Sequence, residues 1–289
     1  MLFRKHSLVI KSYAKLNLSL KIVGTRSDGY HLLDMVNLPL DLHDIVEVNL
    51  MPGAQDTYIT ADDPLLNAMK HNLCGQAVQA LRNRYSFSDN FNIHIHKEIP
   101  FAAGLGGGSS NAAAVLFAVN ELLHLNADQE TLHQIALSIG ADVPYFFLNR
   151  PARLEGIGEI IHPLDCHPSY WCVLIKPKEG VSTKECYQIC DRFPRLPIDN
   201  DKVIEGLKQE DDALIASAYG NDLEPAATEI VPAIKDALNA LRDFGFTLVG
   251  MSGSGSCCYA LTKDFKKAKE AARHFSKTMD FVGLTKTIG

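Results

Sequence analysis

Several features that mark large classes of protein are missing from this 289-residue sequence. No apolar run approaches the length of a membrane span, and the first residues, Met1-Leu2-Phe3-Arg4-Lys5-His6, are not followed by the apolar core of a signal peptide. There is no internal repeat and no low-complexity segment. We therefore expect a cytoplasmic protein that does not act at a membrane.

Excess positive charge is missing too. The chain has 28 Lys and Arg against 34 Asp and Glu, a net charge of −6, and it contains no dense Lys/Arg run. Neither a global nor a local positive field is available for nucleic acid. We expect no nucleic-acid partner, and any phosphate binding must come from a local site.

The cysteines do not form a recognisable framework. There are seven, an odd number, and none has C-x-x-C spacing. This pattern fits reduced, partly buried thiols better than disulfides or a zinc site. His94 and His96 share one face of a predicted strand, but the sequence shows no cysteine or carboxylate cluster beside them, so we interpret them as solvated histidines.

Glycine, in contrast, is concentrated before a predicted helix. Four glycines fall within the five residues Gly104–Gly108, and the N-cap residue types Ser109, Ser110 and Asn111 follow them. The first turn of a helix has backbone N–H groups without intrahelical partners and carries the positive end of the dipole. Glycines just before that turn allow these donors to converge on an anion, so the stretch predicts a polyphosphate site.

Neither common nucleotide motif describes this loop. No Gly-Lys-Ser/Thr closes it as in a Walker P-loop, and the sixth position of a G-x-G-x-x-G would be Ser109. The alternative is a flexible turn before an Ala-rich core helix.

Apolar periodicity predicts strands and helices along the whole chain. The expected strands cover residues 14–22, 46–50, 91–95, 171–175 and 246–250 and a short C-terminal segment, with a hairpin or a pair of loops over 152–164. The expected helices cover residues 65–84, 112–123, 128–138, 184–190, 201–218, 232–244 and 264–276. The result is an α+β chain.

The glycine run, from Pro100 to the Ser-Ser-x-Ala exit, resembles the phosphate loop of the GHMP small-molecule kinases. The segment Ala14-Lys15-Leu16-Asn17-Leu18, together with Arg26-x-Asp28-Gly29-Tyr30-His31, resembles the branch of that family that acts on a cytidine diphosphate compound. Three further segments also resemble motifs of these kinases: Gly140–Pro144, Asn221–Pro225 and Met251–Ser256. The resemblance extends from about Tyr13 to Ala260.

The resemblance implies a two-domain GHMP kinase fold. Residues 1–165 would form the N-terminal ATP-binding domain, similar to ribosomal protein S5 domain 2, and residues 166–289 the C-terminal domain. Element order in the second half is ferredoxin-like. We place the boundary in the proline-broken stretch with His162-Pro163 and His167-Pro168, and the active site in the cleft between the domains.

The implied reaction is transfer of the γ-phosphoryl group of ATP, with Mg²⁺, to the 2-hydroxyl of 4-diphosphocytidyl-2-C-methyl-D-erythritol, in the non-mevalonate route to isoprenoids. Ser110 is a candidate Mg²⁺ contact, but the metal ligands are not assigned. The implied ATP-binding residues are Asn72, Lys97, Pro100, Phe101, Ala102, Ala103, Gly104, Leu105, Gly106, Gly107, Gly108, Ser109 and Ser110. For Asn72 and Lys97 the plain alternatives are a surface asparagine and a strand-end lysine.

Lys15 and Asp142 are the implied catalytic residues. A kinase needs a carboxylate near the acceptor hydroxyl, and Asp142 lies in the family-like Gly-Ala-Asp-Val-Pro segment. From the residues alone, Lys15 fits a solvated strand face, and Asp142, two positions after Gly140, fits a turn or cap.

The implied substrate contacts centre on the cytosine base. Tyr30 and Tyr187 would stack on its two faces while His31 bonds its edge, and the other implied contacts are Asn17, Ser252, Gly253, Ser254 and Gly255. The Ser-Gly segment also reads as a tight turn, and Tyr187 as a core residue. We expect a small-molecule substrate with a cytidine diphosphate group and a monomer or weak homodimer. The rival functions are a GHMP kinase for another alcohol, of homoserine or mevalonate type, and a nucleotide-binding regulator without catalysis.

Overall fold

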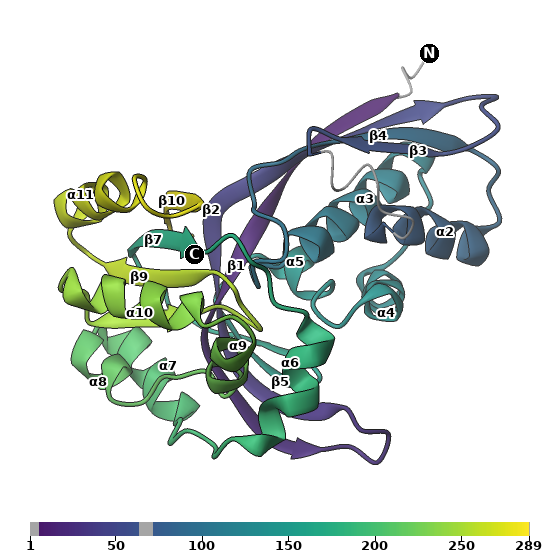
Figure 1. The fold of residues 1–289 in the computed structure, drawn as a ribbon. Helices are drawn as coiled ribbons and strands as arrows, with labels where there is room; N and C mark the ends of the chain where they lie inside the picture. Colours follow the sequence, from purple (N-terminus) through teal and green to yellow (C-terminus); the bar gives the residue numbers. More distant parts are fainter. Residues whose placement is uncertain (1–5, 64–71, 289) are drawn as a thin grey trace. The chain divides into compact units, whose positions relative to one another are not determined.

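The computed structural model describes residues 6–63 and 72–288 (Figure 1). Its strands are β1 (Ser7–Thr25), β2 (His31–Met51), β3 (Tyr58–Ala61), β4 (Asn90–His96), β5 (Ala152–Gly156), β6 (Ile160–Pro163), β7 (Trp171–Lys176), β8 (Leu248–Met251), β9 (Cys258–Thr262) and β10 (Phe281–Lys286). Its helices are α2 (Leu73–Tyr85), α3 (Gly107–Leu123), α4 (Gln129–Ile139), α5 (Tyr145–Leu148), α6 (Thr183–Ile189), the 3₁₀ turn η1 (Cys190–Arg192), α7 (Asn200–Gln209), α8 (Asp212–Ala216), α9 (Glu224–Ile230), α10 (Ala233–Asp243) and α11 (Phe265–Phe275).

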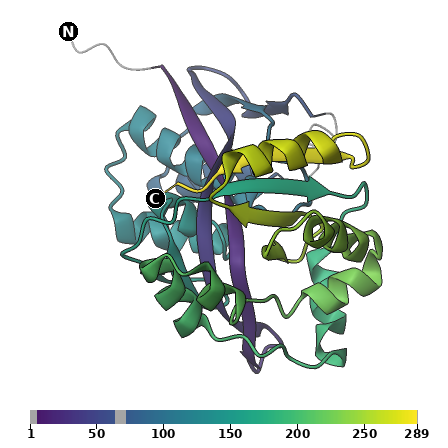
Figure 2. The same cartoon turned by 90° about the vertical axis from the view of Figure 1, so that its left-hand side faces the viewer.

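The chain packs as two compact units that are not contiguous in sequence. Unit 1 contains residues 1–14, 42–99 and 106–148, and unit 2 contains residues 15–41, 100–105 and 149–289. The long paired strands β1 and β2, drawn in purple in Figures 1 and 2, each contribute residues to both units. This division by packing differs from a cut at residue 165, and that domain boundary stays a prediction.

Unit 1 combines strands with a packed group of helices. The end of β2 pairs antiparallel with β4, with Val48 opposite Ile93, and β3 pairs in parallel with β4. The alternating apolar residues of both strands are buried, as their period of two requires. Helices α2, α3 and α4 pack on one another, and α3 is buried along most of its length because its alanines allow close approach.

The second half of the chain supplies a four-stranded antiparallel sheet in unit 2, with strand order β10-β7-β9-β8. In this half the first strand lies next to the last and the second lies at the edge, which is the ferredoxin-like order. Helix α10 contacts β8 and β9, and α11, yellow in Figure 2, lies along the teal strand β7. The expected α+β class and ferredoxin-like half are confirmed.

Strand β1 departs from the expected half-solvated pattern. Its apolar residues from Leu16 to Leu20 are buried, but so are Lys15, Asn17 and Ser19 on the other face. Alternation therefore identified the strand correctly, whereas reading the polar face as solvated is wrong.

Three expected helices differ from the observed ones. The expected helix over residues 65–84 is confirmed as α2 from Leu73, and its residues 65–71, including Leu66 and Met69, lie outside the described residues. The expected helix over 201–218 is two helices, because the backbone turns left-handed at Glu210 (φ 55°). Helix α3 begins at Gly107 with Gly106 as N-cap, so Ser109, Ser110 and Asn111 lie inside the helix and the expectation that they cap it is wrong.

The expected reduced thiols agree with the structure. All seven cysteines are free and buried within the described residues. In residues 6–63 and 72–288, no helix has both the length and the apolar character needed to cross a membrane.

Candidate active site

The second half of the glycine-rich stretch, from Gly106, forms the start of helix α3 in unit 1. Gly106 adopts a left-handed conformation (φ 72°) without a side-chain cap, and the first i→i−4 hydrogen bond of α3 runs from Ser110 N to Gly106 O (2.9 Å). The amides of Gly107, Gly108 and Ser109 precede that bond, so helix geometry leaves them without intrahelical acceptors. The helix dipole adds partial positive charge at the same end, and the arrangement suits a phosphate.

Lys97 brings a cation to this helix start. A Cβ built on Gly107 would lie 3.4 Å from Lys97 Nζ, so the ammonium lies beside the first turn of α3. Lys97 donates to the buried Asp44 carboxylate, which also accepts from the amides of Glu98 (2.9 Å) and Ile99 (2.8 Å). Asp44 thus holds the end of β4 and the lysine against the helix.

Inside α3, the hydroxyl of Ser110 is buried and bonded. Ser12 Oγ lies 2.7 Å from Ser110 Oγ and 2.7 Å from Asn111 Oδ1. Because the amide oxygen of Asn111 can only accept, Ser12 gives it its one proton, and Ser110 then donates to Ser12. This leaves lone pairs on Ser110 Oγ. Asn111 Nδ2 in turn donates to Asp44 (3.0 Å).

Asn72 has a structural task in unit 1. It is the N-cap of α2, and its side chain accepts from Cys74 N (2.8 Å). Asn72 was an implied ATP contact, and its side-chain oxygen already satisfies a helix N–H.

The first half of the glycine-rich stretch, residues 100–105, belongs to unit 2 and is bonded to the Ser-Gly segment after β8. Ser252 Oγ donates to Gly104 O (2.9 Å), and Cys257 N donates to Ala103 O (3.3 Å). A Cβ on Gly104 would lie 1.9 Å from Ser252 O, so a side chain at this position has no room. Ala102 adopts φ 49°, a conformation that glycine takes more easily.

Lys15, Asn17 and Asn37 form a buried chain of hydrogen bonds in unit 2. Lys15 Nζ donates to Asn17 Oδ1, and Asn17 Nδ2 donates to Asn37 Oδ1 (2.6 Å). The backbone of Asn17 donates to Ser252 Oγ (3.1 Å), which ties this chain to the Ser-Gly segment. Among the described residues, Asn37 Nδ2 has no hydrogen-bond partner, although the residue is buried.

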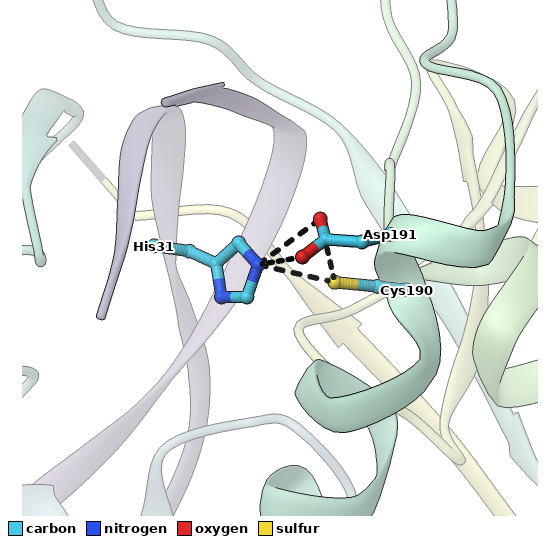
Figure 3. Close-up of side chains that lie close together, drawn as sticks. All are labelled: His31, Cys190 and Asp191. Atoms are coloured by element: carbon cyan, nitrogen blue, oxygen red, sulfur yellow. Dashed lines mark hydrogen bonds and ion pairs between the residues drawn. The ribbon is translucent and has the colours of Figure 1, made fainter. Parts of the chain in front are cut away.

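His31 is the centre of a second cluster in unit 2 (Figure 3). Its ring stacks on Tyr187 with centroids 5.3 Å apart and planes at 28°, and its Nε2 lies 3.0 Å from Asp191 Oδ2 and 3.6 Å from Cys190 Sγ. The hydrogen bond from His31 is the largest cause that lowers the pKa of Asp191. An ionised carboxylate can only accept, so Nε2 carries a proton, and in a neutral imidazole Nδ1 is then the acceptor nitrogen. Tyr30, at 62% exposure, lies one residue before β2.

Asp142 lies between α4 and α5 in unit 1. It is close enough to Tyr145 for its charge to add to burial, the main cause of the raised pKa of the Tyr145 hydroxyl. Lys15 and Asp142 belong to different units, and their meeting at one reaction centre stays a prediction.

Several of these polar residues were missed by sequence reasoning, among them Asn37, Asp44 and Asp191. Asn37 and Asp44 lie within the mostly apolar β2, and Asp191 follows the cysteine that begins η1. A polar residue inside an apolar strand is a usable signal, because burial of an amide or carboxylate requires partners. Asp191 offered no such signal, since an exposed aspartate at a helix end is common.

A separate polar cluster lies on β4 in unit 1. Asp62 contacts His94 Nε2 (3.0 Å) and His96 Nδ1 (3.1 Å), and Glu47 contacts His96 Nε2 (3.1 Å). The premise that no carboxylate lies near these histidines is wrong, because a parallel β3–β4 pair brings Asp62 beside them. Glu47 and Asp62 raise the pKa of His96 through these hydrogen bonds.

Two models of known protein families match the chain, one in each half. Residues 72–150 match the model of the GHMP kinases N terminal domain, and residues 203–280 match that of the GHMP kinases C terminal. A relative from Clostridium beijerinckii named 4-diphosphocytidyl-2-C-methyl-D-erythritol kinase is 36% identical over 291 residues, covering 96% of this chain and 99% of the relative. One of the same name from Chlorobium phaeobacteroides is 37% identical over 268 residues, covering 92% and 93%.

Solved structures of the same kinase family also resemble this chain. A 4-(cytidine 5'-diphospho)-2C-methyl-D-erythritol kinase superimposes with a TM-score of 0.81 at 30% identity, covering 98% of this chain and 100% of the other. The homoserine kinase of Cytophaga hutchinsonii superimposes with a TM-score of 0.73 at 18% identity, covering 100% and 97%, which is a likeness of fold alone.

Proposed function

The chain belongs to the GHMP kinase family, and from that premise we propose that it transfers the γ-phosphoryl group of ATP to the 2-hydroxyl of 4-diphosphocytidyl-2-C-methyl-D-erythritol. The products are the 2-phosphate and ADP, and the reaction serves isopentenyl diphosphate synthesis by the non-mevalonate pathway. The relatives that match over nearly their full length are named as kinases of this compound.

The observation that carries the proposal is the helix start of α3. Three successive amides at the positive end of a 17-residue helix, with the Lys97 ammonium beside them, supply the donors that a polyphosphate needs. Phosphoryl transfer requires little covalent help from a protein; it requires positioning and charge stabilisation.

Lys15 and Asp142 are the proposed catalytic pair. The burial of Lys15 and its hydrogen bond to Asn17 give its ammonium a fixed position, as a group facing the charge on the transferred phosphoryl requires. Asp142 would orient the acceptor hydroxyl and take its proton, and an ammonium beside it would favour the ionised form needed for that role. Asn17 would contact the substrate from the same hydrogen-bonded chain.

The proposed cytosine site is the His31 cluster. With Nε2–H donated to Asp191, the Nδ1 lone pair is available to accept from the exocyclic amino group of the base. Tyr187 already stacks on His31, and Tyr30, one residue earlier in the chain, would supply the second aromatic ring of the sandwich. Asp191 is then a positioning residue, because it sets the histidine tautomer.

Mg²⁺ is the proposed metal of the reaction. It usually binds through one or two protein oxygens together with substrate phosphates, and the lone pairs of Ser110 Oγ fit that requirement. When bound, the ion would neutralise charge on the phosphates. The cytoplasmic location and the monomeric or weakly dimeric state stay predictions.

The direct test measures ADP release in a coupled assay with three alcohols side by side. We expect turnover with 4-diphosphocytidyl-2-C-methyl-D-erythritol and little with mevalonate or homoserine. Preference for either of the others would favour a different GHMP kinase. ATP binding without turnover on any alcohol would favour a non-catalytic regulator.

A further inference from the structure

Three ligand-type atoms of different chemistry meet in the His31 cluster (Figure 3). His31 supplies an imidazole nitrogen from the start of β2, Cys190 a sulfur and Asp191 a carboxylate from η1. All lie within 4.8 Å of one another. Nitrogen, sulfur and carboxylate oxygen are the ligands that Zn²⁺ takes in proteins.

The separations between these atoms fit a tetrahedral ion. Bonds of about 2.0 to 2.3 Å at tetrahedral angles place neighbouring ligand atoms about 3.4 to 3.6 Å apart. Here Nε2 lies 3.6 Å from Sγ, and Asp191 Oδ1 lies 3.2 Å from Nε2 and 3.9 Å from Sγ. Small movements of the exposed Asp191 carboxylate are enough to equalise them.

The surroundings hold two of the three ligands in place. The His31 ring is stacked on Tyr187 and its side chain is only 9% exposed, while Cys190 is buried. Arg195 pairs with Asp191 Oδ1 and donates to Cys190 O (3.2 Å), while both carboxylate oxygens lie within 3.2 Å of His31 Nε2. The guanidinium repels a cation, but a thiolate and a carboxylate together offset a divalent charge.

We propose that His31, Cys190 and Asp191 form a binding site for a thiophilic divalent cation of the zinc type, and that an ion bound there excludes the cytosine base. The second half rests on the proposed function, because it needs the base to bind at His31.

The protons that move when the metal binds explain why a bound ion excludes the cytosine base. The metal–sulfur bond forms as the S–H bond of Cys190 breaks, and that proton goes to solvent. The metal takes the Nε2 lone pair of neutral His31, whose ring proton must move to Nδ1. One proton is released per ion, and Nδ1 changes from acceptor to donor, so it opposes the amino group of cytosine.

The first test is a titration of the full chain with Co²⁺, followed by thiolate-to-metal absorption. This band reports sulfur coordination and is blind to an ion at the histidine-carboxylate cluster of Asp62, His94 and His96. We expect a band that saturates at one ion per chain. Cys190→Ser should abolish it, and Asp191→Ala, at an exposed position, should weaken the affinity at least about tenfold, the lower end of the loss seen even for outer-shell partners.

Cys186→Ser is the matched control. This thiol is buried in the preceding helix α6, but it donates to Leu223 O (3.6 Å) and lies outside the cluster, so the band should remain. Absence of the band in the unaltered chain, or its persistence in Cys190→Ser, would overturn the metal site.

The second test measures inhibition by micromolar Zn²⁺ at several concentrations of the cytidine substrate. Inhibition should raise KM, be overcome by substrate, and disappear in Cys190→Ser but not in Cys186→Ser. Substrate and ATP chelate Zn²⁺ to the same extent in the assay of every variant. A difference in inhibition between the variants therefore reports the metal site. A thiolate band without competitive inhibition would keep the metal site and refute both the exclusion and the placement of cytosine at His31, while turnover itself would still support the kinase.

Discussion

Replacement of Gly104 by alanine tests the packing between the glycine-rich loop and the Ser-Gly segment. The added methyl would lie 1.9 Å from Ser252 O and 2.8 Å from Ser252 C, both backbone atoms that cannot rotate away. Gly104 also has φ +73°, so alanine is strained by its backbone as well as by its neighbours. Gly53→Ala is the control, since Gly53 has φ +80° and nothing within 4 Å of its Cβ position.

The control isolates the backbone cost. A left-handed alanine costs about 1 to 2 kcal/mol, which is the whole expected loss for Gly53→Ala. Overpacking adds about 1 to 3 kcal/mol in Gly104→Ala. If the two segments separate, loss of the Ser252 Oγ to Gly104 O hydrogen bond adds about 1 kcal/mol. The free energies of unfolding of the two variants should therefore differ by about 2 to 4 kcal/mol.

Urea unfolding followed by circular dichroism measures this difference, with the slope of the transition compared between variants. The KM for ATP should also rise in Gly104→Ala and stay unchanged in Gly53→Ala. Equal stability losses in the two variants, within about 0.5 kcal/mol, would refute the close contact between the segments.

Four further outcomes are expected. Lys15→Ala and Asp142→Asn should each lower kcat at least about 100-fold in the ADP-release assay, and near-normal turnover of Asp142→Asn would remove its role as base. Tyr30→Ala and Tyr187→Ala should raise the KM for the cytidine substrate more than they lower kcat, and an unmoved KM would mean that the base binds elsewhere. Asp191→Ala should raise the same KM, while Asp191→Asn, which can still accept from Nε2, should recover part of the loss; equal KM values for the two would argue against control of the tautomer. Glu47 and Asp62 raise the folded-state pKa of His96, so the contribution of His96 to stability is present below the ordinary histidine pKa and is lost as pH rises through the raised value. His96→Gln should therefore lower the free energy of unfolding more at about pH 5.5 than at about pH 8.5. A loss that does not change with pH would contradict this.

Local patterns in the sequence were enough to predict much of the fold. The ferredoxin-like half was accessible because its elements are short, periodic and separated by clear turns. Strand β1 was identified by alternation, but the burial of Lys15 and Asn17 was not, because it depends on partners far away in the chain. Asn37 is 20 residues from Asn17, and Ser252 is 235 residues away.

In the glycine-rich stretch, too, the sequence predicted what depends on neighbouring residues and missed what depends on residues far away in the chain. Its composition predicted an anion-binding helix start, and α3 does begin there with a left-handed Gly106. Composition did not indicate that Gly104 is required by the Ser252 backbone, since a flexible glycine and a sterically required glycine look alike in sequence. The lysine of this site was found by resemblance, whereas Asp44, which holds it, came from a strand 53 residues earlier.

The seven buried thiols give the chain a built-in reporter of its own opening. Thiolates are the reactive species, and burial raises the pKa of Cys74 and Cys186 to about 12. Alkylating reagents should therefore modify Cys74 and Cys186 slowly in the native protein and mark each of them only as its surroundings unfold. A single cysteine introduced on the surface would be labelled selectively, so probes can be attached without first removing the natural ones.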